Sequence, residues 1–318
     1  MKTSNFNLIF GIGVEPLNEI LAHLNSSLDS IDPVERFRQT TDALNKLWNS
    51  AFRENLIEIN NQSDQNSNPS SKKTSDGDKF RGLIGLLSKE KSSEILARSK
   101  EFSELVKLEP RVMDMSVFEE ANYHPSNIGN ELKKDATEKH TSLFNGYNKY
   151  MKSECSLDCL LDRLANLIYV IRSNVDHGEK TPWGPDIEKS TRDRTVCEKA
   201  FPVTKKLLEI FLNEPNKYLA TYGTLQDNEI IQKYSKGAKQ LSGEWTVEGH
   251  VEKANGLLYF NWISNGKKLN VTIYEISEES YKRLDEYEGK GYKRIYVPAF
   301  NDGGKVALVA TIYKKNGQ

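Results

Sequence analysis

The sequence predicts a multidomain protein in which an all-α helical bundle is followed by a small α+β domain of the mixed-sheet or barrel kind. Apolar residues repeat at helical spacing over most of residues 1–214, which we take as the helical domain. Over residues 218–318, short runs rich in Val, Ile, Tyr and Leu alternate with polar turns, as strands do. Between the two patterns, Asn213-Glu214-Pro215-Asn216 has the composition of a linker.

The first helices follow from apolar spacing in chain order. Leucine and isoleucine repeat over 17–28 after Pro16, and a second amphipathic pattern starts after Asp32-Pro33 and runs to about Ile59. Residues 60–78 contain no aliphatic or aromatic side chain, so we expect a disordered loop there. Helical character resumes over 79–109 and weakens over 111–130.

The strongest apolar stripe predicts a helix that begins after Ser156, its expected N-cap, and ends before Gly178 and Pro182. A last helix is expected over 191–212. The stripe consists of Leu157, Leu161, Leu164, Ile168, Ile171 and Val175.

The second domain is predicted to be built from short strands and one helix, which covers about 277–287. Turn signals such as Asn265-Gly266 and Asp302-Gly303-Gly304 separate the strands. The expected strands are 218–222, 245–251, 257–262, 269–276, 294–300 and 306–313.

The composition narrows the class of protein. The chain has 318 residues, and 44 Lys and Arg against 45 Asp and Glu give a net charge of −1, which excludes a globally basic nucleic-acid coat. No run approaches the ~18 apolar residues of a membrane span, and residues 1–10 lack the apolar core of a signal peptide. Cys155, Cys159 and Cys197 are too few for a disulfide framework and show no zinc spacing. We therefore expect a cytoplasmic protein with reduced thiols, no bound metal and no membrane partner.

One string at the end of the strongest helix carries residues suited to RNA cleavage without a metal. Arg172 supplies a permanently charged donor fork for a phosphate. His177 titrates near neutrality and can exchange protons with a 2′-hydroxyl or a leaving oxygen, while Asn174 could orient either partner. The spacing alone also fits a histidine that completes a helix C-cap beside an arginine in a surface ion pair, so both interpretations stay open at this point.

The string from Leu167 to Lys180 resembles the HEPN superfamily, whose hallmark is an Arg a few residues before a His at the end of an apolar helix. The segment 43–48 looks like the first helix of those domains, and the resemblance covers about 30–212. It implies an antiparallel bundle that dimerises, with the motifs of both protomers lining one RNA cleft. Many relatives are ribonucleases of toxin, antiviral or stress systems, and others are binding modules.

A basic stretch follows the motif. Residues 189–206 contain six basic and two acidic residues, and we take Arg192 and Arg194 as candidate RNA contacts. A charge run of this kind is also typical of a solvated helix face.

Two strings in the second domain could form a small-molecule site. Tyr222-Gly223-Thr224-Leu225 follows an apolar strand, and Gly223 permits a tight turn that exposes backbone N–H groups to a carboxylate. Glu288 closes the string Leu284-Asp285-Glu286-Tyr287-Glu288 before a glycine, where an apolar wall could raise its pKa and make it a proton acceptor near pH 7. Taken singly, these features are an ordinary turn and a helix end with solvated carboxylates.

Together with Tyr292 and Arg294, these strings resemble the gamma-glutamylcyclotransferase-like family over essentially all of 218–318. The resemblance implies that residues 222–225 hold the amino and carboxylate end of a gamma-glutamyl group. It also implies that Glu288 takes a proton from that amine, so that 5-oxoproline is released without metal or cofactor. Family members usually carry Gly-Glu where this chain has Val271-Thr272. Two interpretations of the domain, as a catalytic domain and as a ligand-sensing domain, therefore stay open.

The leading prediction is an intracellular HEPN-type ribonuclease, a toxin or antiviral or stress effector, that carries a gamma-glutamylcyclotransferase-like regulatory or sensing domain. The expected partners are RNA, a second copy of the chain through the helical domain, a small gamma-glutamyl-type ligand, and an antitoxin or regulator. One alternative is a gamma-glutamyl-amine cyclotransferase whose helical domain dimerises it. The other is a non-catalytic interaction protein.

Overall fold

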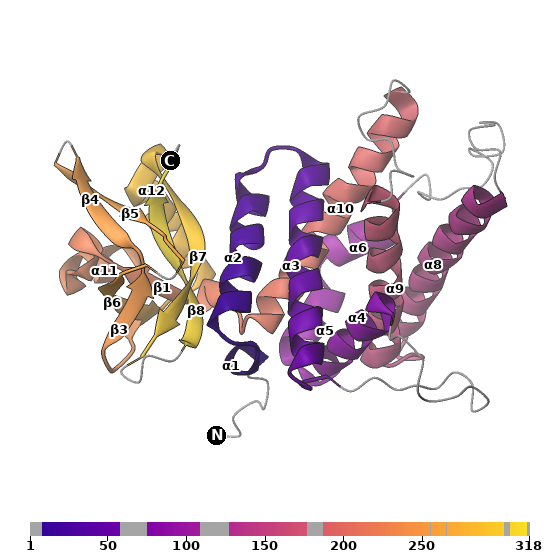
Figure 1. The fold of residues 1–318 in the computed structure, drawn as a ribbon, viewed down its shortest axis with the longest axis horizontal. Coiled ribbons are helices and arrows are strands. Elements are labelled where there is room, and N and C mark those ends of the chain that lie inside the picture. Colours follow the sequence, from indigo (N-terminus) through magenta and orange to yellow (C-terminus); the bar gives the residue numbers. More distant parts are fainter. Residues whose placement is uncertain are drawn as a thin grey trace. The chain divides into compact units, whose positions relative to one another are not determined.

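The computed structural model describes residues 8–57, 75–108, 127–176, 187–254, 256–264, 266–301 and 306–316 (Figure 1). Contacts divide the chain into two compact units, of which one is Ser26–Ile210 and the other combines Met1–Asn25 with Phe211–Gln318. The expected helical region and the expected sheet domain are both present. The division differs from the expected boundary because the first 25 residues group with the sheet instead of with the helices.

The helical unit starts with α3, Pro33–Arg53. Asp32 caps this helix, since its Oδ1 accepts hydrogen bonds from the backbone N of Val34 at 2.8 Å and of Glu35 at 3.2 Å. The helix stops at Arg53, six residues before the expected end at Ile59. The remaining elements are α4 Asp76–Gly85, a 3₁₀ turn Leu86–Lys89, α5 Lys91–Ala97, α6 Lys100–Val106, α8 Asn127–Met151, α9 Leu157–Asp176 and α10 Ile187–Phe211.

The loop expected over 60–78 lies outside the described residues except at its end. There Ser75 caps α4 through its Oγ, which accepts from Asp78 N at 3.1 Å, so that residues 76–78 are helical and not loop. Acidic residues in the first turn favour a helix start, and burial of Phe80, Leu83 and Ile84 stabilises the turns that follow. Apolar spacing alone does not reveal this cap, since the capping side chain of Ser75 is polar.

Helix α9 begins as expected. Ser156 Oγ accepts from Cys159 N at 3.3 Å, and the buried side of the helix includes Leu161, Leu164, Ile168 and Ile171. The helix packs against α8 and α4. Among the described residues, no helix is both long enough and apolar enough to cross a membrane.

The second unit is built around a closed sheet. The strands are β1 Tyr218–Thr221, β2 Lys239–Gln240, β3 Trp245–Glu248, β4 His250–Ala254, β5 Leu257–Asn261, β6 Lys268–Glu275, β7 Tyr292–Phe300 and β8 Val306–Lys315. They hydrogen-bond in the order β1-β8-β7-β3-β6-β2, and β1 also pairs with β6, which closes a small barrel. Only β1 and β8 run parallel in these pairings. Strands β4 and β5 form a separate hairpin.

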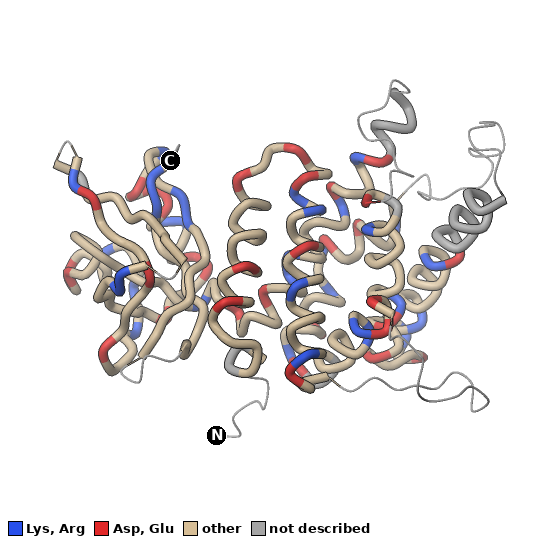
Figure 2. The backbone as a smooth tube through the Cα atoms, in the orientation of Figure 1, with Lys and Arg blue, Asp and Glu red and all other residues tan. Residues whose placement is uncertain are grey.

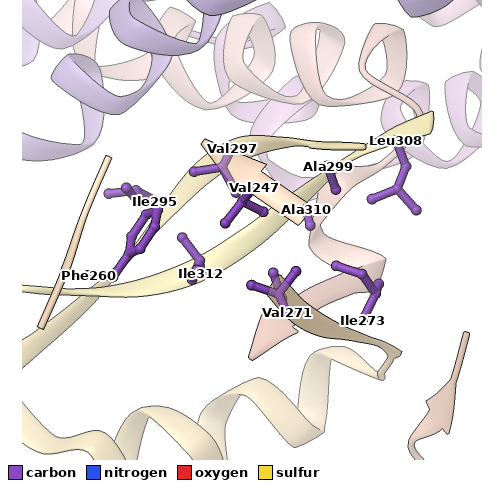
Figure 3. Close-up of a cluster of buried hydrophobic side chains, with 11 residues drawn as sticks. Val247, Phe260, Val271, Ile273, Ile295, Val297, Ala299, Leu308, Ala310 and Ile312 are labelled. Carbon is purple, nitrogen blue, oxygen red and sulfur yellow. The ribbon is translucent and has the colours of Figure 1, made fainter. Parts of the chain in front are cut away.

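The interior of the barrel is filled by aliphatic side chains from alternate strand positions (Figure 3). Phe260 of the hairpin is fully buried among them, so the hairpin contributes to this core. A second cluster lies on the outer side, where β1, β6 and β8 meet α11 (Asn228–Tyr234) and α12 (Glu278–Glu288). Its buried members are Leu219, Leu225, Ile231, Tyr274, Ile276, Tyr281, Leu284 and Tyr313.

The chain's first helices, α1 Leu8–Ile12 and α2 Val14–Asp29, explain why its first residues group with the sheet. The amide of Asn25 donates to the carbonyl oxygen of Tyr296 in β7 at 2.9 Å and accepts from its N–H at 2.8 Å. The Asn18 amide donates to buried Glu248 at 3.3 Å. These contacts pair buried polar groups over long sequence separations, which apolar spacing cannot predict.

Candidate functional site

The turn after β1 is fixed by the Tyr222 hydroxyl. Tyr222 Oη donates to the carbonyl oxygen of Tyr313 at 2.9 Å and accepts from Phe260 N–H at 3.2 Å. Residues Gly223–Gln226 then form a 3₁₀ turn, in which Leu225 is buried and Thr224 is exposed. The tyrosine therefore ties the turn both to β8 and to the β4–β5 hairpin.

Gly223 is required at this turn for two reasons. Its φ of +61° lies in the left-handed region that favours glycine. A Cβ at this position would also lie 2.9 Å from Leu258 Cδ1 of the hairpin. The hairpin thus lies directly over the turn, and the partly exposed Leu258 covers its backbone.

Glu288 is the last residue of α12, and Gly289, whose N–H bonds the carbonyl oxygen of Asp285, caps the helix. The side chain is half-buried, and burial raises the pKa of Glu288 to about 7. Burial and, to a lesser degree, the charge of Glu288 raise the pKa values of Tyr222 and Tyr292 as well. The carboxyl of Glu288 thus lies near enough to both tyrosines to raise their pKa values. We call Glu288, Tyr222, Tyr292 and the 223–226 turn the Glu288 site.

Tyr292 completes this arrangement from the start of β7. Its hydroxyl donates to the carbonyl oxygen of Leu258 at 3.0 Å, and its ring stacks on Tyr259 with centroids 5.9 Å apart. Two tyrosine hydroxyls of the Glu288 site, those of Tyr222 and Tyr292, therefore bond the backbone of the same hairpin.

Asp285, one helical turn before Glu288, connects the two predicted strings. It accepts from the Tyr313 hydroxyl at 2.7 Å and from Arg294 Nη2 at 3.1 Å, and Arg294 lies over the Tyr281 ring, 4.3 Å from its centroid. The carbonyl oxygen of the same Tyr313 holds Tyr222. Asp285 has no predicted role, and Tyr313 is not among the predicted site residues, since its only signal in the sequence is an aromatic residue in the last strand.

Val271 and Thr272 lie beside the Tyr222 turn. In the β1–β6 pairing Thr221 faces Thr272, and its hydroxyl donates to the carbonyl oxygen of Thr272 at 3.1 Å. Val271 is buried in the barrel interior (Figure 3). Val271 thus contributes its side chain to the barrel core, and Thr272 contributes its backbone carbonyl oxygen to the bond with Thr221.

The raised pKa of Glu288 predicts a pH-dependent stability. Its ordinary value of 4.5 applies in the unfolded chain and about 7 in the folded one. The folded state therefore keeps the proton more tightly, and stability falls as pH rises from about 4.5 through 7. At about 1.4 kcal/mol per pKa unit the full shift corresponds to about 3 kcal/mol, and solvent screening around this half-buried carboxyl reduces the cost above pH 7 to about 1–2 kcal/mol. We expect Glu288→Gln to match the wild type in free energy of unfolding below pH 4.5 and to exceed it above pH 7 in urea titrations. Equal free energies of unfolding for the variant and the wild type at both pH values would contradict the raised pKa of Glu288.

The RNA-cleavage string is described only in part. Arg172 Nε lies 3.1 Å from Asp176 Oδ2, and its guanidinium carbon is 5.8 Å from the Trp48 ring centroid. His177 lies outside the described residues, and so does the side chain of Asn174. Where it is described, the string thus shows the arginine in an ion pair within its own helix.

The basic stretch on α10 is paired with carboxylates where its side chains are described. Arg194 Nη1 lies 2.8 Å from Oδ2 of Asp32, the residue that caps α3, and Lys199 lies 3.0 Å from Glu104. Lys205 and Lys206 both face Glu209, whereas the side chain of Arg192 lies outside the described part. Figure 2 shows acidic and basic residues interspersed along the helices of the helical unit. Arg194 therefore has a structural partner between two helices of the bundle.

Comparisons with known proteins concern the sheet domain. The family model described as gamma-glutamyl cyclotransferase, AIG2-like, matches residues 219–318. PH0828 of Pyrococcus horikoshii, a provisionally named gamma-glutamylcyclotransferase, is 37% identical over 89 residues, which are 26% of this chain and 71% of that protein. The gamma-L-glutamyl-butirosin B gamma-glutamyl cyclotransferase of Niallia circulans is 40% identical over 78 residues, 23% of this chain and 46% of that protein. The chain thus spans less than half of the second relative.

Among solved structures, the crystal structure of PH0828 aligns with a TM-score of 0.25 and 30% identity, covering 32% of this chain and 79% of that one. The family model covers none of the helical unit, and the HEPN resemblance gains no support from these comparisons. The resemblance of residues 218–318 to gamma-glutamylcyclotransferases is confirmed. Through this C-terminal domain, the chain belongs to the gamma-glutamyl cyclotransferase, AIG2-like family.

Proposed function

We propose that the chain is a gamma-glutamyl-amine cyclotransferase, which releases 5-oxoproline and a free amine from a gamma-glutamyl compound. The observation that carries the proposal is Glu288, a half-buried carboxyl with a pKa of about 7 at the family's motif position. A general base works best when its pKa lies near the working pH. Of the predictions made from the sequence, this was the alternative, and the family relationship favours it over the ribonuclease.

In the proposed reaction, the Glu288 carboxylate takes a proton from the substrate's α-ammonium group. The freed nitrogen attacks the side-chain carbonyl carbon, so that a ring C–N bond forms. The C–N bond to the leaving amine then breaks as the leaving nitrogen takes the first proton back from Glu288. The regenerated carboxylate passes the second proton of the ring nitrogen to the released amine, which departs as an ammonium ion. Atoms and charge balance without a cofactor.

The tyrosines of the Glu288 site serve as walls and supports in this proposal. Burial raises the pKa of Tyr222 well above its usual range, so its hydroxyl stays protonated near neutral pH. That hydroxyl proton is donated to the Tyr313 carbonyl oxygen. Tyr222 therefore positions the 223–226 turn, whose backbone and Thr224 hydroxyl are proposed to hold the amino and carboxylate end of the substrate.

The helical unit has no assigned chemistry in this proposal. RNA, a second copy of the chain and a regulatory partner remain untested predictions, as do the roles given to Arg172, Asn174, His177, Arg192 and Arg194. The pairing of Arg172 with Asp176 and of Arg194 with Asp32 favours the structural interpretation of those two arginines.

The test is an assay of the full chain against gamma-glutamyl amino acids and gamma-glutamyl alkylamines at neutral pH. We expect 5-oxoproline and free amine in equal amounts from at least one of these classes, with and without EDTA. If a folded sample releases no 5-oxoproline from any of them, the cyclotransferase proposal is wrong and the ligand-sensing alternative takes its place.

A further inference from the structure

Two cysteines lie together at the start of α9, outside the site described above. Cys155 precedes the N-cap Ser156, and Cys159 stands in the first turn, where its N–H donates to Ser156 Oγ at 3.3 Å. Cys155 Sγ lies 3.4 Å from the Ser156 carbonyl oxygen, and the two cysteine side chains are close enough to shift each other's pKa in opposite directions. Both side chains are partly exposed, whereas Cys197 is fully buried. A small reagent can therefore reach this pair but not Cys197.

An anchored arginine lies beside Cys159. Arg163, one turn further along α9, donates from Nη1 to the carbonyl oxygen of Ser142 at 2.9 Å and to its Oγ at 3.0 Å. Gly146 of α8 makes room for it, because a Cβ there would lie 2.5 Å from Arg163 Cδ. The packing of α8 against α9 thus holds the guanidinium next to the thiol.

The two thiols differ in chemistry as a result. Hydrogen bonds from Cys155 and from Arg163 lower the pKa of Cys159, although the charge of Asp162 opposes this shift. Burial and the hydrogen bond to Cys159 raise the pKa of Cys155, against the charges of Arg163 and Lys149. Cys159 is therefore the nucleophile and Cys155 the proton-bearing partner.

We propose that Cys155 and Cys159 form a reversible dithiol–disulfide site that reacts with low-molecular-weight disulfides. The Cys159 thiolate attacks one sulfur of the small disulfide, which forms a mixed disulfide and releases one small thiolate. Cys155 then attacks the Cys159 sulfur and releases the second small thiolate, which takes up the Cys155 proton. The chain is oxidised by two electrons, and one small disulfide is reduced to two thiols.

The spacing of the pair allows this bond. Cys155 and Cys159 are four residues apart across the start of α9, and a disulfide requires roughly 4.4–6.8 Å between the two Cα atoms. Cys155 lies before the helix, so its backbone is not held by the helical ladder. A metal site is not favoured, since the described residues contain no cluster of three or more His, Cys, Asp or Glu that could hold an ion.

The test treats the full chain, reduced and then freed of reductant, with oxidised glutathione at neutral pH, and follows intact mass and thiol-containing peptides. We expect a Cys155–Cys159 disulfide, seen as loss of two hydrogen atoms, while Cys197 stays reduced. Cys155→Ser should accumulate a glutathione adduct on Cys159 at least about fivefold faster than Cys159→Ser accumulates one on Cys155. Arg163→Met should slow adduct formation on Cys159.

A control in urea separates the folded geometry from intrinsic reactivity. In the unfolded chain all three cysteines should react at similar rates, and the preference for Cys159 should disappear. Equal rates for the two single variants in the folded chain would overturn the proposal. So would stable adducts on both cysteines of the wild type without an internal disulfide. The mass measurement does not depend on the activity of any variant. If a variant fails to fold, the peptide map of the wild type still tests the proposal.

Discussion

Replacing Glu288 with glutamine is expected to slow the release of 5-oxoproline severely while leaving the fold intact. Glutamine keeps the size of the side chain but cannot accept a proton from an ammonium group. General-base contributions are typically about 10²–10⁴-fold in rate, so kcat should fall by that factor. Because the carboxyl is half-buried with a pKa of about 7, its neutral replacement should also raise the unfolding midpoint at neutral pH.

Glu286→Gln is the matched control for this variant. Glu286 lies in the same helical turn and is exposed, so the same chemical replacement is made there without touching the site. It should keep wild-type turnover. In the wild type, kcat/KM should rise with pH through about 7, as Glu288 of the free protein loses its proton. Full activity in Glu288→Gln, or a profile with no inflection near 7, would contradict its role as the base.

The local elements of the sheet domain could be predicted from the sequence because each strand depends on near-neighbour signals. The expected run over 306–313 matches β8, Val306–Lys315, and the helix expected near 277–287 matches α12, Glu278–Glu288. The short strand β2 and helix α11 were missed, since two and seven residues give too little periodicity.

Contacts between residues far apart in the chain could not be predicted from such near-neighbour signals. The apolar face of α2 indicates a helix, but nothing in its spacing states that Asn25 bonds the backbone of Tyr296 in β7. Similarly, the motif residues Tyr222 and Glu288 were found from their strings, whereas Tyr313, which connects them through Asp285, has no local signature. The partners of charged residues could not be predicted for a related reason: the local sequence of Arg194 does not show that it pairs with Asp32 from a distant segment.

Asp285→Ala is expected to lower both turnover and stability, although Asp285 itself is proposed to touch no substrate. Its carboxylate accepts from the buried Tyr313 hydroxyl at 2.7 Å and pairs with Arg294. A buried hydroxyl left without its acceptor costs about 1–3 kcal/mol, while the ion pair adds little because the Asp285 side chain is 43% exposed. We therefore expect the free energy of unfolding to fall by about 2 kcal/mol.

The effect on turnover follows from where these bonds lie. Tyr313 holds the Tyr222 turn with its carbonyl oxygen and the last turn of α12 with its hydroxyl, so Asp285 sets the position of Glu288 relative to that turn. Displacement of a reacting group by about 1 Å can cost about 10²-fold in rate. We expect kcat to fall by about 10–10²-fold in Asp285→Ala, and by less in Tyr313→Phe, which keeps the carbonyl bond to Tyr222 and the Arg294 pair.

The pH profile decides whether Asp285 acts by positioning or only by supporting the fold. If the end of α12 loosens, water reaches the Glu288 carboxyl, and the inflection of kcat/KM should move from about 7 toward the ordinary value of 4.5. A purely structural role would lower the folded fraction and leave the inflection of the remaining enzyme unchanged. Measuring the profile of Asp285→Ala at a temperature where the variant is fully folded separates the two, and an unmoved inflection with wild-type kcat would rule out positioning.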